Sequence, residues 1–301
     1  MQKIVVTGSN GLLGQTLVNL LDKSDYEVYA LSRGVDRNIT SSNYTYYNID
    51  LIDFSEVKRI LRKIDPHIIV NTAAMTNVDE CEDNKKACDR INIELVEHLT
   101  EVCIETNAHL IHISTDFIFD GKNGPYKEND KPNPLNYYGL SKLKSEKIIT
   151  SSKINYTILR TILVYGYVKG MNRNNIVLWI RDAVTDKKQV TIIDDQFRMP
   201  TLVDDLAEAC LLAMKHEAKG IFNVSSNELL SIYDMAICIA DVFNLDKSYI
   251  KRVSTKELNQ RAPRPVKTGF DLTKSKNSLE LPIYSFKERL QYFKNQLDKT
   301  S

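Results

Sequence analysis

A glycine-rich turn close to the N-terminus restricts the fold of this chain more than any other feature. The turn, Gly8-Ser9-Asn10-Gly11-Leu12-Leu13-Gly14, lies between a short apolar run, Ile4–Thr7, and an amphipathic segment, Leu12–Leu21. The first glycine permits a tight turn, the second lets the backbone approach a pyrophosphate, and the third lets a helix pack closely on a strand. Free N–H groups at the start of that helix would bind the phosphates. The turn therefore predicts a dinucleotide-binding site.

The rest of the first half alternates short apolar runs with longer helical patterns. The expected strands are Ile4–Thr7, Glu27–Leu31, Ile68–Asn71, Leu110–Ser114 and Tyr156–Arg160, and the expected helices are Leu12–Leu21, Ser55–Lys63, Lys85–Glu105 and Tyr138–Ile149. Near-continuous apolar strands are typical of parallel strands that are buried on both faces. Repeated β-α-β order therefore predicts an α/β fold with a doubly wound (Rossmann) parallel sheet.

The second half is less regular and predicts a smaller, discontinuous α/β lobe that binds substrate. Its expected helices are Asn175–Asp186, Val203–Lys215 and one that is capped by Ser231 and runs to Phe243, and its expected strands are Val190–Ile193 and Ile221–Val224. We expect Trp179 to pack on the apolar side of its helix. Residues 1–162 should form the cofactor domain, with a returning segment near 195–226, and residues 163–194 and 227–301 the substrate-binding lobe.

Composition excludes several classes of protein. Lys and Arg number 40 against 39 Asp and Glu, a net charge of +1, which argues against nucleic-acid binding through bulk charge. No apolar run approaches the roughly 18 residues of a membrane span, and no secretory signal is seen at the N-terminus. His109 and His112 would point to opposite faces of a strand and could not share a metal. We expect a cytoplasmic protein, a monomer or homodimer, without metal, membrane or nucleic-acid partners.

The residues after the second expected strand help to choose the cofactor. A carboxylate at this place would bind the ribose 2′-hydroxyl and repel a 2′-phosphate. This chain has Ser32 and Arg33 instead, and a hydroxyl with a guanidinium suits a 2′-phosphate. The pattern favours NADPH (NADP) over NADH, which remains an alternative, as does a solvated surface role for Arg33.

A tyrosine and a lysine provide the candidate proton donor. Tyr138 and Lys142 are four residues apart on an expected helix and hence share a face. A phenol has a pKa of about 10, so proton transfer at neutral pH needs a nearby cation. Thr115 follows the expected strand Leu110–Ser114, at the sheet edge where such folds bind ligands. The three residues together predict a catalytic set.

With these motifs the chain resembles the extended short-chain dehydrogenase/reductase superfamily and, within it, the dTDP-4-dehydrorhamnose reductase family. The similarity spans most of the chain. Besides the glycine turn it rests on Asn71-Thr72-Ala73-Ala74, Thr76-Asn77-Val78-Asp79, Ser114–Gly121, Pro125–Glu128, Pro134–Leu143, Arg160-Thr161, Val164–Gly166, Pro200-Thr201 and Asp205–Ala207. The resemblance implies NADPH-dependent reduction of the C4 ketone of a nucleotide-activated 6-deoxyhexose, as in the formation of dTDP-L-rhamnose.

The resemblance also implies roles for individual residues. Thr115 would bind the ketone oxygen, Tyr138 would donate the proton, and Lys142 would lower the pKa of Tyr138 and hold the ribose. The implied cofactor contacts are Gly8, Ser9, Asn10, Gly11, Leu12, Leu13, Gly14, Ser32, Arg33, Asp50, Leu51, Ala73, Ala74, Met75, Tyr138 and Lys142. The implied substrate contacts are Thr76, Val78, Asp116, Phe117 and Arg198.

Two departures from the family pattern leave alternatives open. Ile162-Leu163 stands where the family usually has Ser-Trp, and Arg198 stands where a glycine is common. Arg198 would contact a sugar diphosphate or pair with Asp195. One alternative function is a non-catalytic regulator similar to the β-subunit of methionine adenosyltransferase, which shares these motifs. Another is a sugar-nucleotide epimerase with tightly held NAD, against which the missing carboxylate after Leu31 counts.

Overall fold

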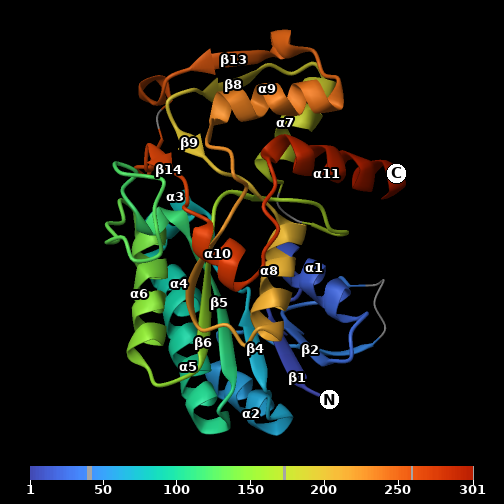
Figure 1. Ribbon diagram of the computed structural model, residues 1–301, viewed down its shortest axis with the longest axis vertical. Coiled ribbons are helices and arrows are strands. Elements are labelled where there is room, and N and C mark those ends of the chain that lie inside the picture. Colours follow the sequence, from blue (N-terminus) through green and yellow to red (C-terminus); the bar gives the residue numbers. More distant parts are fainter. Residues whose placement is uncertain (39–42, 172–173, 259, 301) are drawn as a thin grey trace.

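The computed structural model describes residues 1–38, 43–171, 174–258 and 260–300 (Figure 1). Among them, seven strands form one parallel sheet in the order β11-β6-β5-β4-β1-β2-β3. These strands are β1 (Lys3–Thr7), β2 (Glu27–Ser32), β3 (Tyr44–Asn48), β4 (Ile68–Asn71), β5 (His109–Thr115), β6 (Tyr156–Thr161) and β11 (Gly220–Val224). The strand order reverses between β1 and β4, so the carboxyl ends of these strands flank the crevice where such folds bind ligands.

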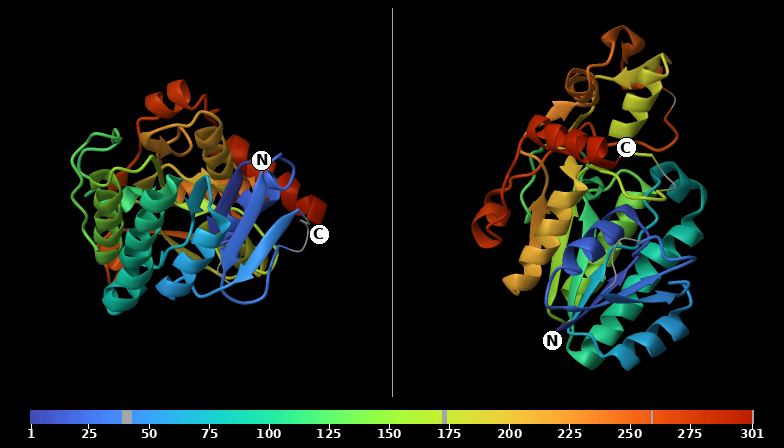
Figure 2. Two further views of the ribbon diagram at one scale, coloured as in Figure 1. Left: turned by 90° about the horizontal axis from the view of Figure 1, so that it is seen from below. Right: turned by 90° about the vertical axis from the view of Figure 1, so that its right-hand side faces the viewer.

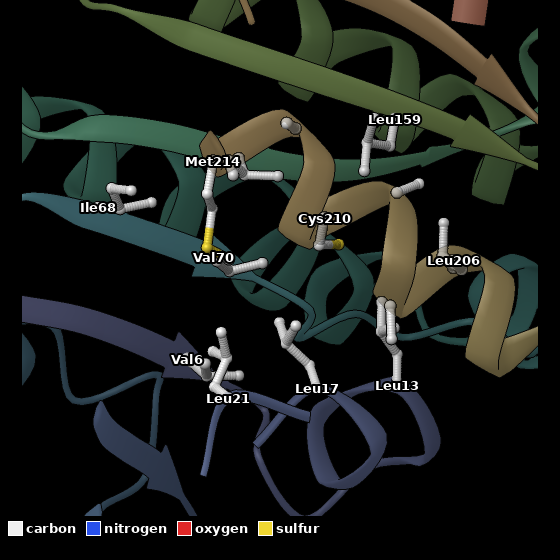
Figure 3. Close-up of a cluster of buried hydrophobic side chains, with 14 of the residues drawn as sticks. Val6, Leu13, Leu17, Leu21, Ile68, Val70, Leu159, Leu206, Cys210 and Met214 are labelled. Carbon is white, nitrogen blue, oxygen red and sulfur yellow. The ribbon is translucent and has the colours of Figure 1, made fainter. Parts of the chain in front are cut away.

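Helices cover both faces of the sheet, which confirms the doubly wound fold (Figure 2). One face carries α1 (Leu12–Leu21) and α8 (Val203–Lys215), and the other carries α2 (Phe54–Ile64), α5 (Leu95–Thr106) and α6 (Tyr137–Ser151). Alternate residues of β1 serve the two cores, because Ile4 and Val6 face α1 whereas Val5 faces α2. Figure 3 shows Leu17 of α1 and Cys210 of α8 meeting in the first core.

The helix expected over Lys85–Glu105 is interrupted. The structure has α4 (Lys85–Asp89), a π-helical turn over Arg90–Glu94, and then α5. π-helical turns within α-helices are rare, and those that occur are often found at functional sites. Here the wider turn carries the buried Asn92, whose contacts are described below.

The second lobe lies beyond the carboxyl ends of the sheet strands (Figure 1). Its helices are α7 (Ile176–Thr185), α9 (Ile232–Phe243) and α11 (Phe286–Thr300), and its strand pairs are β8 (Val190–Ile193) with β13 (Ile250–Val253) and β7 (Val164–Tyr165) with β10 (Thr201–Leu202). A small sheet joins β12 (Leu230–Ser231), β9 (Phe197–Arg198) and β14 (Lys267–Thr268). The remaining helices are α3 (Val78–Asp83), α10 (Thr273–Ser278) and 3₁₀ turns at Asp116–Ile118, Lys247–Tyr249 and Thr255–Glu257. Tyr165, Phe286 and Phe293 pack edge to face in the lobe core.

Further local features differ from the sequence-based expectations. The edge strand β3 and the C-terminal helix α11 are not predicted, because β3 is short and only half-buried and α11 is strongly charged. The expectation for Trp179 is wrong: its side chain is 43% exposed, and Val177, Leu178 and Ile180 fill the buried face of α7.

Within the described residues, no helix is long and apolar enough to span a membrane.

Candidate active site

The glycine turn closes tightly onto its neighbours. Gly8 has a φ of +70°, and a Cβ on it would lie 2.8 Å from the backbone nitrogen of Ala73. A Cβ on Gly14 would lie 2.3 Å from the carbonyl oxygen of Gly8, whereas one on Gly11 would lie 3.2 Å from the same oxygen. Gly11 is the N-cap of α1 and offers no side-chain acceptor, so the first-turn N–H groups keep their positive end for a ligand.

The Ser9 hydroxyl gives an independent sign of a ligand in this turn. Ser9 is buried, and its Oγ has no hydrogen-bond partner among the described residues. A buried hydroxyl without a partner is costly, and a phosphate oxygen would satisfy it. The cradle and the hydroxyl together fit a dinucleotide pyrophosphate.

We expect Gly14→Ala and Gly11→Ala to have different effects. The new methyl group of Gly14→Ala collides with backbone, so it should cost roughly 1–3 kcal/mol of unfolding free energy, as overpacking does. Gly11→Ala should keep most of the stability but weaken dinucleotide binding, because its methyl group would lie where the expected pyrophosphate approaches the backbone. Urea unfolding and fluorescence titration measure the two effects. Equal stability losses in both variants would contradict this account of the turn.

The Asn10 side chain braces the loop that follows β2 and carries Arg33. Its Nδ2 donates to the carbonyl oxygens of Arg33 (3.1 Å) and Val35 (3.0 Å), and its Oδ1 accepts from the N–H of Arg37 (3.0 Å). Arg33 is 79% exposed at its side chain and lies 3.5 Å from Asp50. Asn10 thus positions the loop that carries Arg33, while Ser32 is buried at the end of β2.

Thr115 and Tyr138 lie together where β5 ends and α6 begins. The Thr115 side chain lies beside the Tyr138 hydroxyl. A close approach of α6 makes this contact: a Cβ on Gly139 would lie 2.1 Å from the carbonyl oxygen of Phe117. Burial of the hydroxyl, reinforced by the nearby Asp116, raises the pKa of Tyr138, although the adjacent Thr115 side chain opposes that shift. The phenol is therefore a neutral proton donor at neutral pH.

Lys142 lies one turn along the same face of α6 and contacts a histidine outside the Tyr-Lys motif. Its Nζ is 2.9 Å from Nε2 of His112 on β5. Burial lowers the pKa of Lys142 to about 8. The expected lowering of the Tyr138 pKa by Lys142 is not seen, because burial dominates that pKa and Lys142 points toward His112.

Asn92 fixes the strip that follows β4. Its Oδ1 accepts from the N–H of Met75 (2.8 Å), and its Nδ2 donates to the Met75 carbonyl (3.0 Å) and to Ser141 Oγ on α6 (3.0 Å). This side chain holds the expected cofactor strip, Ala73–Met75, against the helix of Tyr138. The only sequence signal for it is a polar residue within an apolar helical pattern.

Comparison with known proteins places this arrangement in a family. The model of the RmlD substrate binding domain matches residues 1–299. The chain belongs to this family. As a member of the RmlD family it is 32% identical over 258 residues to "Methionine adenosyltransferase 2 subunit beta" of Bos taurus, covering 84% of this chain and 75% of the relative. It is also 32% identical to "Spore coat polysaccharide biosynthesis protein SpsK" of Bacillus subtilis, covering 88% of this chain and 87% of that protein.

Solved structures of the RmlD family agree. A dTDP-4-dehydrorhamnose reductase from Clostridium acetobutylicum superposes with a TM-score of 0.87 at 26% identity, covering 99% of this chain and 100% of the other. One from Bacillus anthracis, in complex with NADP, gives a TM-score of 0.86 at 28% identity, covering 98% and 99%. A UDP-glucuronic acid 4-epimerase from Bacillus cereus with NAD, at 21% identity, shares the fold. The resemblance to the extended short-chain dehydrogenases/reductases is thus confirmed, and the structural relatives bind NADP or NAD.

The contacts of Arg198 differ from the two alternatives expected for it, a sugar diphosphate or Asp195. Its pairing with Asp195 is wrong, because Asp195 instead accepts hydrogen bonds from Thr255. Arg198 is buried and donates to the carbonyl oxygens of Phe197, Val266 and Pro265. Its Nε lies 3.8 Å from Asp116. The guanidinium is committed to protein acceptors, which argues against a contact with a sugar diphosphate.

Asp116 also lies behind the site and does not line it. Its carboxylate accepts from the hydroxyls of Thr115 (3.1 Å) and Thr268 (2.5 Å). Burial raises the pKa of Asp116, while Arg198 opposes that shift. Asp116 thus connects the end of β5 with β14 of the second lobe and orients Thr115 rather than presenting a free carboxylate.

The expected substrate contacts Thr76 and Val78 adjoin an open pocket. Val78 begins α3, and a pocket of about 410 Å³ next to this helix is lined by Asn77, Asp79, Leu258, Gln260, Arg261 and Arg264. Arg264 donates to Asp79 (2.8 Å) across it. Phe117 is half-buried, and its ring packs edge-on against Tyr138. In the part of the chain that the structure describes, no His, Cys, Asp and Glu side chains gather as metal ligands would.

Proposed function

We propose that this chain is an NADPH-dependent reductase of the C4 ketone of a nucleotide-activated deoxysugar, with dTDP-4-dehydro-L-rhamnose as the substrate and dTDP-L-rhamnose as the product. The observation that carries the proposal is the contact between Thr115 and a neutral Tyr138 beside Lys142, at the carboxyl edge of the sheet. The RmlD-family relatives named as dTDP-4-dehydrorhamnose reductases support the substrate class.

The reaction needs a hydride and a proton. NADPH, when bound, supplies the hydride. Tyr138 donates its phenolic proton to the ketone oxygen. The Thr115 hydroxyl donates to Asp116 in the structure, and turning that one proton to the ketone oxygen would orient the substrate. Lys142 would hold the ribose through its amino group.

The direct test is turnover with purified protein. NADPH oxidation should be seen with dTDP-4-dehydro-L-rhamnose in a panel of dTDP- and UDP-linked 4-keto sugars, and the product should be identified as dTDP-L-rhamnose. Tight NADPH binding without turnover on any member would reject the reductase. NAD recovered with the purified protein would instead favour an epimerase.

A second candidate is a non-catalytic dinucleotide-binding subunit. Relatives named as subunit beta of methionine adenosyltransferase 2, with an identity of 32% for the bovine protein, support it. A chain with this role should bind a methionine adenosyltransferase catalytic subunit and change its kinetics. Co-elution of the two proteins in gel filtration, with no sugar-nucleotide turnover, would favour this candidate over the first.

We expect Arg33→Ala to lower the affinity for NADPH but not for NADH. A guanidinium that binds a 2′-phosphate is worth about 1.5–3 kcal/mol, so the Kd for NADPH should rise roughly 10- to 100-fold. The Kd for NADH should change little. Arg59→Ala is a matched control, since Arg59 is an exposed arginine of the same domain that pairs with Glu56. Equal loss of NADH and NADPH binding in Arg33→Ala would contradict the assignment.

A further inference from the structure

A buried polar chain leads from the cofactor strip to Lys142. Asn71 at the end of β4 and His112 on β5 are direct neighbours in the strand register. His112 Nδ1 lies 3.2 Å from Asn71 Nδ2, and His112 Nε2 lies 2.9 Å from Lys142 Nζ. All three side chains are buried, so each of their hydrogen bonds must be made inside the protein.

The donors in this chain fix the proton on the histidine. Asn71 Oδ1 accepts from the N–H of Ala73 (3.3 Å) and the hydroxyl of Thr7 (2.7 Å). The other end of the amide, an NH₂ group that can only donate, therefore faces His112 Nδ1. Nδ1 must accept, so a neutral His112 carries its proton on Nε2. Burial keeps the pKa of His112 low and the ring neutral.

The Nε2–H of His112 then points toward Lys142. An ammonium group has three donors and no acceptor, whereas a neutral amine offers a lone pair. Ser145 Oγ, 3.2 Å from Nε2, is a second acceptor for this N–H, since it donates its own proton to the Lys142 carbonyl. A protonated Lys142 therefore faces a second donor, the Nε2–H of His112. A neutral Lys142 can instead accept a hydrogen bond from that N–H.

We propose that His112 is a positioning residue that favours the neutral form of Lys142 before the cofactor binds, so that binding of a nicotinamide dinucleotide takes up a proton at Lys142. The ribose hydroxyls of a bound cofactor can accept hydrogen bonds from the ammonium group of Lys142, which the Nε2–H of His112 cannot do. Cofactor binding therefore stabilises the ammonium form. The proton comes from the buffer and forms the third N–H bond of the ammonium group. This inference rests on the proposed cofactor site but not on the proposed reaction.

The direction of the pH dependence follows from linkage. A group whose pKa is raised by binding strengthens binding fully below its free-state pKa, and that gain is lost as the pH rises through the bound-state pKa. Lys142 has a free-state pKa of about 8. NADPH affinity should therefore be constant near pH 7 and about tenfold lower near pH 9.

Two other titratable groups also affect the pKa of Lys142, and substitutions distinguish their effects from that of His112. Glu146, on the same helix, and Cys88, on α4, both raise the pKa of Lys142. Glu146 is paired with Arg160 of β6. The contact with Cys81 lowers the pKa of Cys88. Cys88→Ser removes this thiol and should leave the loss of affinity near pH 9 in place.

The test compares two histidines of one strand. His112→Gln places an amide oxygen near Lys142 in place of the N–H, so the ratio of NADPH affinities between pH 7 and pH 9 should fall from about tenfold to about twofold. His109 lies on the other face of β5, where it bonds Thr157 (2.8 Å), and His109→Gln should keep the tenfold ratio. An unchanged ratio in His112→Gln would overturn the proposal.

A second measurement uses the unaltered protein and does not depend on the folding of a variant. Calorimetric titration near pH 8, in buffers of different ionisation enthalpy, should show uptake of about half a proton per dinucleotide bound. NADH should give the same uptake, which separates Lys142 from the 2′-phosphate of NADPH. No uptake with either ligand would overturn the proposal, while binding with uptake but without ketone reduction would reject the reductase alone.

Discussion

Tyr138→Phe should lower turnover of the 4-keto sugar by about 10²–10⁴-fold, the usual contribution of a positioned general acid. The variant keeps the ring that packs against Phe117 and removes only the hydroxyl that meets Thr115. NADPH affinity should stay within a few-fold of the unaltered protein, because Lys142 and the glycine turn are untouched. Stopped-flow measurement of NADPH oxidation, together with a fluorescence titration, separates the two effects.

The preceding residue provides the control for this prediction. Tyr137 donates its hydroxyl proton to the Asp89 carboxylate (2.8 Å) and not toward Thr115. Tyr137→Phe should therefore keep turnover close to that of the unaltered protein. Similar losses in both variants would mean that the hydroxyls support the fold and would remove Tyr138 from the proton-donating role.

The raised pKa of Tyr138 also predicts the shape of the pH profile. A proton donor is active in its protonated form, which is present below its pKa. Burial places that pKa above the ordinary value of a phenol, so loss of the Tyr138 proton should not limit turnover anywhere between pH 6 and about pH 9. A falling limb in that range should instead follow NADPH affinity and be removed by saturating cofactor.

Features that depend on local spacing could be predicted from the sequence. The glycine turn lies between β1 and α1 as expected, because Gly8 adopts a positive φ and a Cβ on Gly14 would meet the Gly8 carbonyl oxygen within the turn. Tyr138 and Lys142 share a face of α6, since their four-residue spacing guarantees it within a helix. The doubly wound parallel sheet follows from repeated β-α-β units. These arguments need no knowledge of distant contacts.

Features that depend on strand register or on interlobe contacts could not. His112 meets Asn71 because β4 and β5 pair in one register, which periodicity does not specify. The Arg198–Asp116 contact joins β9 of the second lobe to the end of β5. Sequence proximity to Asp195 suggested the wrong partner. Asn92 reaches Met75 from a π-helical turn, which no apolar pattern announces.

Glu146→Ala should cost about 3–5 kcal/mol of unfolding free energy, the loss typical when one member of a buried ion pair is removed. Glu146 on α6 binds Arg160 of β6 through two hydrogen bonds (3.0 and 2.7 Å). The two side chains are only 4% and 3% exposed. The substitution leaves the Arg160 charge buried with the Glu128 carbonyl (2.9 Å) and the face of the Phe119 ring (5.4 Å to its centroid) as partners. Urea unfolding of both proteins measures the difference.

An exposed pair of the same geometry isolates the effect of burial. Arg62 and Glu105 also form two hydrogen bonds (2.7 and 2.8 Å), but their side chains are 54% and 43% exposed. Glu105→Ala should cost only about 0–1 kcal/mol, because water replaces the lost partner. Equal losses in the two variants would mean that the hydrogen bonds, and not the desolvated charge, determine the cost.

The double variant Glu146→Met/Arg160→Met completes the argument. Replacing both members of a buried pair with apolar side chains of similar volume is often neutral or stabilising, because no charge remains to be desolvated. The double variant should therefore regain most of the stability that Glu146→Ala loses. Because α6 carries both Tyr138 and Lys142, the turnover of the double variant tests whether the ion pair also orients that helix. Full stability with reduced turnover would assign the pair to positioning. Full recovery of both stability and turnover would assign it to stability alone.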